Sequence, residues 1–314
     1  MTLSVIIPCR NAVNTIGAQL DALCRQRWNG SWEVLVVDNG STDGSRDLIK
    51  RYRGRLPGLR IVTTRKRGAA HARNAGARAA SGEAFVFCDA DDEVADQWLS
   101  AMADALWHHE FVASRMEVEK LNPAWLAHRL HNVQGFGLRR MPYPPYLRHA
   151  GSSGLGIRRA RHEEVGGFDE TLLHREDTDY CFRVQLRGVE LHFESAAVIH
   201  IRYSARSNDL FRQARLWAQY HSLLYRRYAD DGSLKGCWRS YLRTWRDLIR
   251  CLPRTLSRET RAAWMKTLGT QVGLLQGSIK YGVPPICEPV QKQVAESPEA
   301  LLDAFVDGPN LENR

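Results

Sequence analysis

Four acidic side chains follow an apolar run in the stretch FVFCDADDEV, residues 85–94. Such close carboxylates repel one another unless a cation neutralises them. Carboxylate oxygens are the ligands that Mg²⁺ and Mn²⁺ prefer, and diphosphate oxygens can complete the shell of such an ion. A solvated acidic turn, or the first turn of a helix, is the alternative interpretation. The stretch is therefore a candidate site for a metal ion and a diphosphate.

Strands that alternate with helices must position these acids. Short apolar runs predict buried strands in LSVIIPC, WEVLVVD, LRIVTT and EAFVFC, with helices between them. This alternation predicts an α/β fold with a mostly parallel, Rossmann-like sheet flanked by helices over residues 1–107. Ligands bind such sheets beyond the carboxyl ends of the strands. The acidic cluster lies at one of these ends, as do Arg10-Asn11 and Asp38-Asn39.

The chain after this sheet is less regular. Three prolines favour a loop within residues 121–150, where MPYPPY predicts an extended lid. Between residues 151 and 203 we expect strands in GSSGLGIRR, ELHFE and AAVIHIRY, and a helix in REDTDYCFRVQLRG. The expected domains are a catalytic domain over 1–205, a basic amphipathic helical region over 206–283 and an acidic, Pro-containing tail over 284–314.

The positive charge of the chain is concentrated in the helical region. The 314 residues carry a formal net charge of +9, yet residues 201–283 alone hold 16 basic and 5 acidic residues. A helix predicted over 237–254 combines apolar residues at helical spacing, which include Trp238 and Trp245, with five arginines. Such a helix either lies in an anionic membrane interface or packs on the catalytic domain or on a second subunit of a homodimer. Nucleic acid is not an expected partner, because no nucleic-acid module is recognisable.

Cysteines and apolar runs bound the cellular context. Seven scattered cysteines without a CxxC pair make a zinc site or a disulfide framework unexpected. No apolar run reaches the roughly 18 residues of a membrane span, and the first residues do not resemble a signal peptide. We expect a cytoplasmic protein, which the basic helix would bring to the inner face of the membrane if it binds lipid.

Six motifs occur in order between roughly residues 2 and 205. They are VIIPCRN, VLVVDNGSTDGS, RGAAHARNAGARAASGE, FCDADDEV, GGFDE and EDTDYCFR. With these motifs the chain resembles the family-2 glycosyltransferases, whose GT-A fold binds nucleotide-sugars. The resemblance implies a metal-dependent, inverting transfer of a sugar from a nucleotide-diphospho-sugar to an acceptor hydroxyl.

The resemblance also implies which residues bind the nucleotide. Pro8 and Arg10 would line the base pocket, and Asp38 would accept a hydrogen bond from the base, typically uracil. The residues implied near the nucleotide or the diphosphate are Arg67, Arg73 and Asn74. A turn-capping role for Asp38 and a solvated helix face for the arginines are the structural alternatives.

The acidic cluster receives distinct roles from the same resemblance. Asp89 would contact the ribose or the sugar, and Asp92 would position the donor sugar. Asp91 would hold Mn²⁺ or Mg²⁺, and His200, which follows the last motif, would reach the metal or the diphosphate. A purely structural histidine is the alternative for His200.

A second acidic pair, Glu176 and Asp177, opens the helix predicted in HREDTDYCFR. Inverting sugar transfer needs a base that removes the acceptor hydroxyl's proton, which contributes about 10²–10⁴ in rate. By resemblance Asp177 is this base, and Glu176 is an acceptor contact or an alternative base. Acids in a first helical turn also stabilise the helix dipole, which is the structural alternative.

The expected reaction is the transfer of one sugar, most simply from a UDP-sugar, in glycan or glycoconjugate biosynthesis. The acceptor is a hydroxyl of a glycan, a lipid-linked sugar or a small molecule. Processive polysaccharide synthases carry Gln-x-x-Arg-Trp and membrane helices, which this sequence lacks. Two other functions remain open at this stage: a sugar-phosphate nucleotidyltransferase, and a non-catalytic nucleotide-binding or membrane-scaffold protein.

Overall fold

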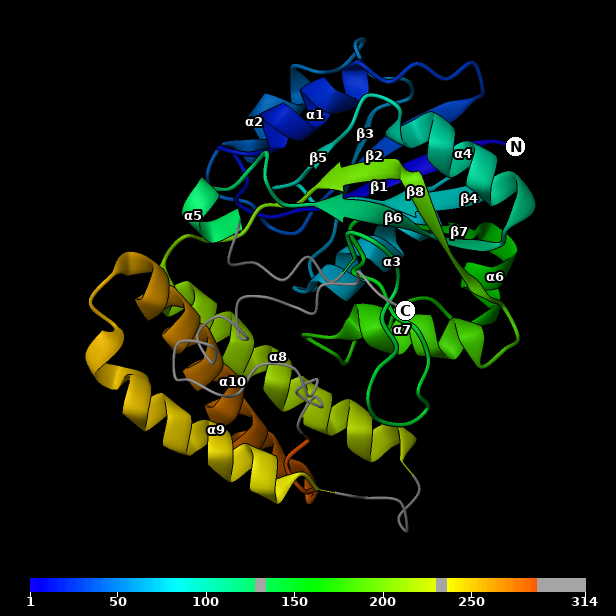
Figure 1. Cartoon of the computed structure of the whole chain (residues 1–314). Coiled ribbons are helices and arrows are strands. Elements are labelled where there is room, and N and C mark those ends of the chain that lie inside the picture. Colours follow the sequence, from blue (N-terminus) through cyan, green and yellow to red (C-terminus); the bar gives the residue numbers. More distant parts are fainter. Residues whose placement is uncertain (128–133, 230–235, 287–314) are drawn as a thin grey trace. The chain divides into compact units, whose positions relative to one another are not determined.

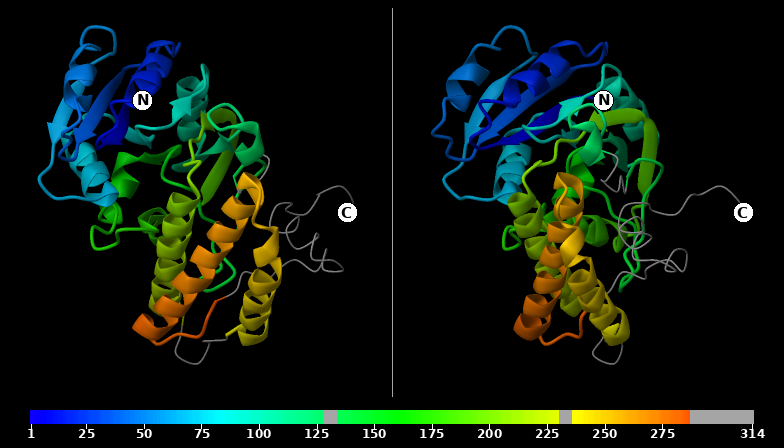
Figure 2. Two further views of the ribbon diagram at one scale, coloured as in Figure 1. Left: turned by 90° about the vertical axis from the view of Figure 1, so that its left-hand side faces the viewer. Right: turned by 60° about the vertical axis from the view of Figure 1, so that its left-hand side comes forward.

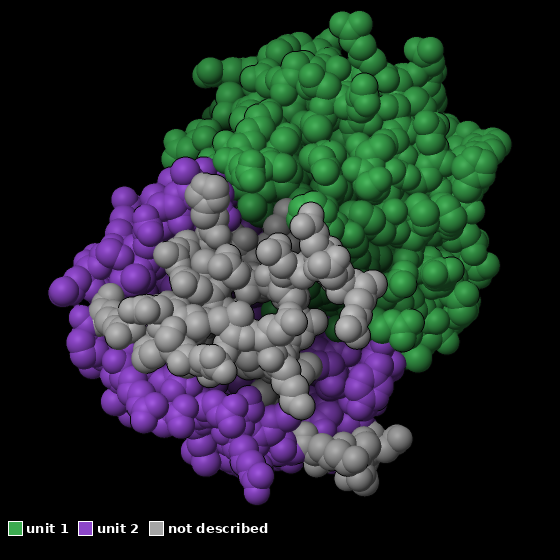
Figure 3. Space-filling model, in the orientation of Figure 1, with its two compact units in different colours: residues 1–121, 132–140, 147–202 green, residues 122–131, 141–146, 203–314 purple. Residues whose placement is uncertain are grey.

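The structure is a computed structural model that describes residues 1–127, 134–229 and 236–286 (Figure 1). The chain forms two compact units, which Figure 3 distinguishes by colour. Unit 1 comprises residues 1–121, 132–140 and 147–202, and unit 2 comprises residues 122–131, 141–146 and 203–314.

An eight-stranded sheet forms the centre of unit 1, in the order β3-β2-β1-β4-β7-β6-β8-β5. Its strands are β1 Leu3–Cys9, β2 Trp32–Asp38, β3 Arg60–Thr63, β4 Ala84–Phe87, β5 Glu93–Val94, β6 Phe111–Glu117, β7 Leu155–Arg158 and β8 Leu191–His200. The first four strands are parallel, as the alternation of strands and helices predicts. β7 runs antiparallel to both β4 and β6, so the second half of the sheet is mixed.

Helices cover both faces of this sheet (Figure 1). One face carries α1 Ile16–Cys24, α2 Ser45–Lys50 and α4 Trp98–His108. The opposite face carries α3 Ala69–Ala79, α6 Arg159–Glu164 and α7 Glu176–Gln185. Because α3 and α7 lie on the same face, they can bring residues that are far apart in the sequence to one site.

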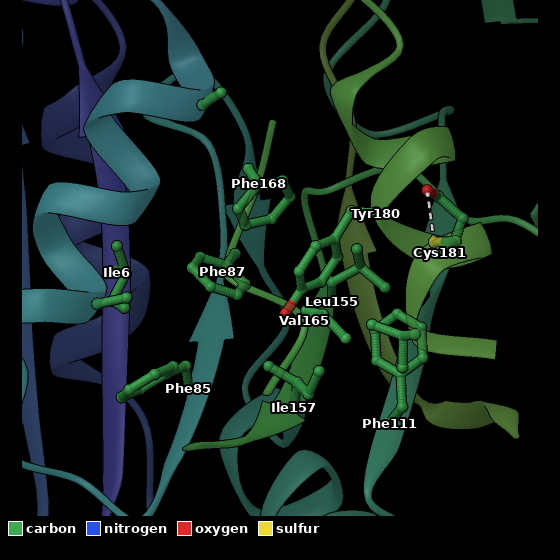
Figure 4. Close-up of a cluster of buried hydrophobic side chains, with 14 of the residues drawn as sticks. Ile6, Phe85, Phe87, Phe111, Leu155, Ile157, Val165, Phe168, Tyr180 and Cys181 are labelled. Carbon is green, nitrogen blue, oxygen red and sulfur yellow. Dashed lines mark hydrogen bonds between the residues drawn. The ribbon is translucent and has the colours of Figure 1, made fainter. Parts of the chain in front are cut away.

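The core beneath α7 fixes the orientation of that helix (Figure 4). Tyr180 is fully buried and stacks on Phe168 with the ring centroids 4.2 Å apart. Its hydroxyl is hydrogen-bonded to Nδ1 of His162 at 2.7 Å, so the buried polar group is satisfied. The first turn of α7, which bears Glu176 and Asp177, is therefore held on a rigid support.

The sequence did not predict every element. β6 and its pairing with β7 and β8 were missed, because no turn signal marks the residues after α4. Two strands were expected in ELHFE and AAVIHIRY, but residues Leu191–His200 form the single strand β8. A register shift within it, where Glu194 pairs with Ser114 and Val198 pairs with Arg115, explains the break in the apolar pattern.

Unit 2 is helical. Its elements are α5 Ala124–Ala127, α8 Ser207–Tyr228, α9 Trp238–Cys251, the 3₁₀ turn η2 Leu252–Arg254 and α10 Arg258–Tyr281. α10 packs against both α8 and α9 (Figure 2). Glycines allow the close approach of α8, since a Cβ at Gly273 would collide with the carbonyl oxygen of Arg215. The described helices include none whose length and apolar character would suffice to cross a membrane.

The MPYPPY stretch, for which a lid was expected, contributes to unit 2. Met141 and Tyr143 are buried, and the Tyr143 hydroxyl is hydrogen-bonded to Nδ1 of His221 in α8 at 2.8 Å. Residues 128–133 and 287–314, which include most of the predicted tail, lie outside the described residues. The predicted domain boundaries at 205 and 283 stay predictions.

Candidate active site

The carboxyl ends of β1, β2 and β4 meet at one edge of the sheet, because these strands are parallel. Cys9 at the end of β1 pairs with Asp38 at the end of β2, and Arg10 follows directly. β4 ends at Phe87, two residues before Asp89. Unit 1 thus brings the predicted base pocket and the acidic cluster to the same edge of the sheet, where ligands bind in folds of this kind.

On the β2 side, the turn after the strand is held by buried polar groups. Asp38 is buried and accepts a hydrogen bond from the backbone nitrogen of Ser41 at 3.0 Å. Asn39 donates to the carbonyl oxygen of Lys66 and accepts from the backbone nitrogen of Gly68. These bonds fix the loop that presents Arg67. Pro8 is half-buried, and Arg10 and Arg67 are exposed, so they are open to a ligand.

Arg73 connects the two acidic groups of the site. It comes from α3, is buried, and places Nη2 at 2.7 Å from Oδ1 of Asp89 and Nη1 at 2.9 Å from Oε1 of Glu176. Burial disfavours the guanidinium charge, but Asp89 and Glu176 more than offset this and raise the pKa of Arg73. Residues that the sequence placed in separate motifs thus form one bridge, Asp89–Arg73–Glu176.

Glu176 is the first residue of α7 and has an unusual ionisation. Burial, and then the neighbouring Asp177, raise the pKa of Glu176 to about 7, whereas Arg73 acts in the opposite direction. Asp177 is half-buried, and its Oδ1 accepts a hydrogen bond from the backbone nitrogen of Thr178 at 2.7 Å. A carboxyl that titrates near neutral pH beside a second carboxylate is typical of acid–base sites.

The three aspartates of the acidic cluster have different surroundings. Asp92 is buried, and its two oxygens accept hydrogen bonds from Oγ of Ser153 at 2.6 Å and from the backbone nitrogen of Arg202 at 3.0 Å. Burial, followed by the charges of Asp89 and Asp91, raises the pKa of Asp92 well above its ordinary value. Asp92 therefore holds the cluster together, whereas its predicted contact with the donor sugar stays a prediction.

Asp91 is the aspartate that can accept a cation. It is exposed, and no side chain that the structure describes forms a hydrogen bond or ion pair with its carboxylate. The negative charge of Asp89 lies close to it. A carboxylate that lacks a partner and lies near another negative charge is suited to bind a divalent cation.

The described residues contain no group of three or more His, Cys, Asp and Glu side chains that could hold a metal ion alone. This is compatible with Mg²⁺ or Mn²⁺, since such ions are commonly bound through one or two carboxylates and the substrate's phosphates. Asp91 fits that arrangement. His200 is hydrogen-bonded through Nδ1 to Glu117. Histidines that bind a metal through one ring nitrogen commonly hold a carboxylate on the other, so the metal-binding role of His200 stays a prediction.

Asn74 follows Arg73 in α3 but faces the turn that contains GGFDE. Its side chain donates to the carbonyl oxygen of Phe168 at 2.8 Å and accepts from the backbone nitrogen of Phe168 at 2.9 Å. A Cβ at Gly167, whose φ is 72°, would lie 2.6 Å from Oδ1 of Asn74. The contacts of Asn74 thus position this turn, whereas its predicted contact with the donor stays a prediction.

Three residues that shape the site carry no signal in the sequence. The Ser153 hydroxyl links Asp92 to the backbone of Asp89, and Arg202 donates to both Asp92 and the carbonyl oxygen of Asp91. His149 lies near Arg175 and Asp177, and loss of solvation, followed by the Arg175 charge, lowers its pKa to about 4. Their local sequences carry no signal for these contacts, which depend on the fold.

The part of the chain that contains the predicted donor site also matches known proteins. The family model described as glycosyl transferase family 2 matches residues 4–166. Glycosyltransferase AglE of Haloferax volcanii is 28% identical over 195 residues, which cover 61% of this chain and 64% of AglE. The uncharacterized glycosyltransferase YibD of Escherichia coli is 39% identical over 92 residues, 29% of this chain and 26% of YibD. The chain thus matches less than two thirds of these relatives.

Solved structures support the fold. The mannosyltransferase PcManGT from Pyrobaculum calidifontis, in complex with GDP-Man and Mn²⁺, superposes with a TM-score of 0.61 at 22% identity, over 89% of this chain and 86% of that chain. TarS 1–349 of S. aureus, in complex with UDP-GlcNAc, gives a TM-score of 0.54 at 16% identity, over 90% and 93%. These similarities confirm the predicted GT-A-like α/β fold with its C-terminal helical extension.

Proposed function

Because the chain belongs to glycosyl transferase family 2, we propose that it transfers a single sugar from a nucleotide-diphospho-sugar to an acceptor hydroxyl, with inversion at the anomeric carbon. The observation that carries this proposal is the Asp89–Arg73–Glu176 bridge. It joins the acidic cluster, where a diphosphate would bind, to the first turn of α7, where a base is needed. Both halves of the reaction are therefore supported by one rigid group of side chains.

The donor is proposed to be a UDP-sugar. Asp38, at the end of β2, offers a hydrogen-bond acceptor to the base of the nucleotide. Arg10, directly after β1, offers a positive charge to the same nucleotide. TarS was solved in complex with UDP-GlcNAc, which supports this choice, whereas PcManGT was solved with GDP-Man. Both are similar in fold, so a panel of donors must include both bases.

Asp177 is proposed as the general base. It stands beside Glu176 in the first turn of α7, and its Oδ1 is oriented by the backbone of Thr178. Arg73 holds Glu176, so α7 keeps a fixed position relative to Asp89. Asp177 would accept the proton from the acceptor hydroxyl as this oxygen attacks the anomeric carbon and the nucleoside diphosphate leaves.

A divalent cation, Mn²⁺ or Mg²⁺, would be held by Asp91. When bound, it would neutralise charge on the leaving diphosphate. Asp92 supports Asp91 by fixing the turn through Ser153 and Arg202. Arg67, on the loop held by Asn39, is exposed and would contact the diphosphate.

The release of nucleoside diphosphate tests this function. The purified chain, Mn²⁺ and a panel of UDP-, dTDP- and GDP-sugars are incubated with glycan and simple sugar acceptors. We expect one donor class to yield nucleoside diphosphate and a product whose anomeric configuration, read by NMR, is inverted. Pyrophosphate release from a nucleoside triphosphate and a sugar phosphate would instead identify a nucleotidyltransferase.

The activity is expected to depend on pH through Glu176. The ionised form binds Arg73, and the pKa of Glu176 is raised to about 7. We therefore expect kcat/KM, which reports ionisations of the free enzyme, to fall as the pH decreases below about 7 and to level off above it. In Glu176→Gln this limb should move to lower pH, because the titrating group and its charge beside Asp177 are gone. An unchanged limb in Glu176→Gln would contradict this assignment.

A further inference from the structure

Helix α9 of unit 2 has a packed face. Tyr241 and Leu248 are buried, and the Tyr241 hydroxyl donates to the carbonyl oxygen of Gln271 in α10 at 3.3 Å. Nε1 of Trp264, also in α10, donates to the carbonyl oxygen of Leu248 at 2.9 Å. α9 thus packs on α10 of its own unit, and this packing uses only one side of α9.

A second side of α9 is apolar and exposed. We call it the apolar stripe, and its members are Trp238, Leu242, Ile249 and Leu252. Between 52% and 71% of the surface of each is accessible to solvent. At 3.6 residues per turn, the three members within α9 lie within an arc of about 40°. An unfilled row of large apolar side chains on one helix marks a contact surface.

A third side of α9 is positively charged. This arginine row consists of Arg239, Arg243, Arg246 and Arg250, all exposed. By helical periodicity the row flanks the apolar stripe on the side away from the packed face. Only Arg246 has an acidic partner, Asp247 at 3.0 Å, within the part of the chain that the structure describes. The remaining arginines carry charge that no described carboxylate offsets.

We propose that this side of α9 binds the surface of an anionic lipid bilayer. In such a complex the apolar stripe would enter the boundary between headgroups and acyl chains, and the arginine row would contact anionic headgroups. The charges select this partner. Two copies of the chain that met through this surface would bring two arginine rows together, and a polyanion such as RNA would leave the apolar stripe exposed.

The inference is independent of the proposed reaction, because lipid binding is measured without a donor or an acceptor. Binding to a bilayer would, however, affect which acceptors the chain meets. A chain held at a bilayer meets acceptors that are anchored in the same bilayer at a high effective concentration.

Flotation of the full chain with vesicles tests the proposal. Vesicles of phosphatidylcholine with phosphatidylglycerol are compared with vesicles of phosphatidylcholine alone, at low and high salt. We expect binding to the anionic vesicles that weakens as the salt concentration increases. Arg239→Gln/Arg243→Gln/Arg250→Gln should weaken it roughly 100-fold, since each arginine near a charged surface contributes a factor of about 5.

Two further variants make the test specific. Leu242→Ser/Ile249→Ser should also lose vesicle binding, while its melting temperature stays unchanged because both side chains are exposed. The matched control, Arg46→Gln/Arg51→Gln/Arg53→Gln, removes three exposed arginines from unit 1 and should bind as the wild type does.

Several outcomes would overturn the proposal. The first is that the wild type does not float with anionic vesicles. The second is that the arginine variant loses binding but Leu242→Ser/Ile249→Ser keeps it, which would indicate a polyanion site instead. The third is that light scattering shows a dimer that Leu242→Ser/Ile249→Ser dissociates, which would assign the surface to a second copy of the chain.

Discussion

Asp177→Asn is expected to lower kcat by about 10²–10⁴ while the dissociation constant for the donor changes little. The amide keeps the shape of the carboxylate and can still accept the hydrogen bond from the Thr178 nitrogen. It cannot accept the acceptor's proton at neutral pH. The loss should therefore lie in the transfer step, which is measured as the initial rate of nucleoside diphosphate release at saturating substrates.

A matched control separates this effect from a general effect of the substitution. Asp47 also lies in the first turn of a helix, α2, and is exposed beside Lys50. Asp47→Asn should leave kcat unchanged. If Asp177→Asn retained more than about a tenth of the wild-type kcat, Asp177 would not be the base, and Glu176 would become the candidate.

Arg73→Met is expected to destabilise unit 1 by up to about 3–5 kcal/mol. The substitution leaves Glu176 buried without its cation and also removes a partner of Asp89. The Asp89 side chain is 32% exposed, so water partly compensates there and the larger part of the cost arises at Glu176. Urea denaturation followed by circular dichroism measures the difference.

The loss of stability in Arg73→Met should also depend on pH and should be larger at high pH. The folded-state pKa of Glu176 is already raised to about 7 from its ordinary value of 4.5, and the loss of Arg73 raises it further. The folded protein then keeps the Glu176 proton that the unfolded chain has lost, so the stability that this proton confers is present at low pH and disappears as the pH rises through the folded-state pKa. Arg73→Met should therefore be closer to the wild type at pH 5 than at pH 8.

A neighbouring arginine of the same helix provides the control. Arg78 lies in α3 with 68% of its side chain exposed and at 3.7 Å from Glu170. Arg78→Met should change the free energy of unfolding by less than about 1 kcal/mol. Equal effects at Arg73 and Arg78 would show that the bridge contributes nothing to stability.

The sequence predicted the first half of the sheet because its signals are local. The strands at Leu3–Cys9 and Trp32–Asp38 are continuous apolar runs that end in polar turns, and the pattern alone indicates buried parallel strands. β7 and β6 depend instead on antiparallel pairing between segments about 40 residues apart. No local pattern specifies that pairing, and none indicates that Tyr143 of MPYPPY is hydrogen-bonded to His221 in unit 2.

The site was predictable in its residue types but not in its connections. Asp89, Asp91 and Glu176 were found because acids follow a strand or open a helix. Arg73 and Asn74 are neighbours in the sequence, yet Arg73 contacts the two acids and Asn74 contacts the backbone of Phe168. Adjacent residues of a helix face different directions, and which direction faces the site is decided by how α3 packs.

The most direct test of a metal-assisted donor site at the sheet edge is nucleotide binding. The melting temperature of the wild type and of Asp91→Asn is measured with UDP, dTDP and GDP, each with and without Mn²⁺. A ligand at 100 times its dissociation constant stabilises the folded chain by about 2.7 kcal/mol. Asp96→Asn, which changes an exposed aspartate that pairs with Arg25, is the control.

We expect one nucleoside diphosphate, most simply UDP, to stabilise the wild type and Asp96→Asn only when Mn²⁺ is present, and to stabilise Asp91→Asn much less. If no nucleoside diphosphate stabilised the chain, or if stabilisation were the same without Mn²⁺ and in Asp91→Asn, the acidic cluster would not be a metal-assisted donor site and the proposed function would have to be abandoned.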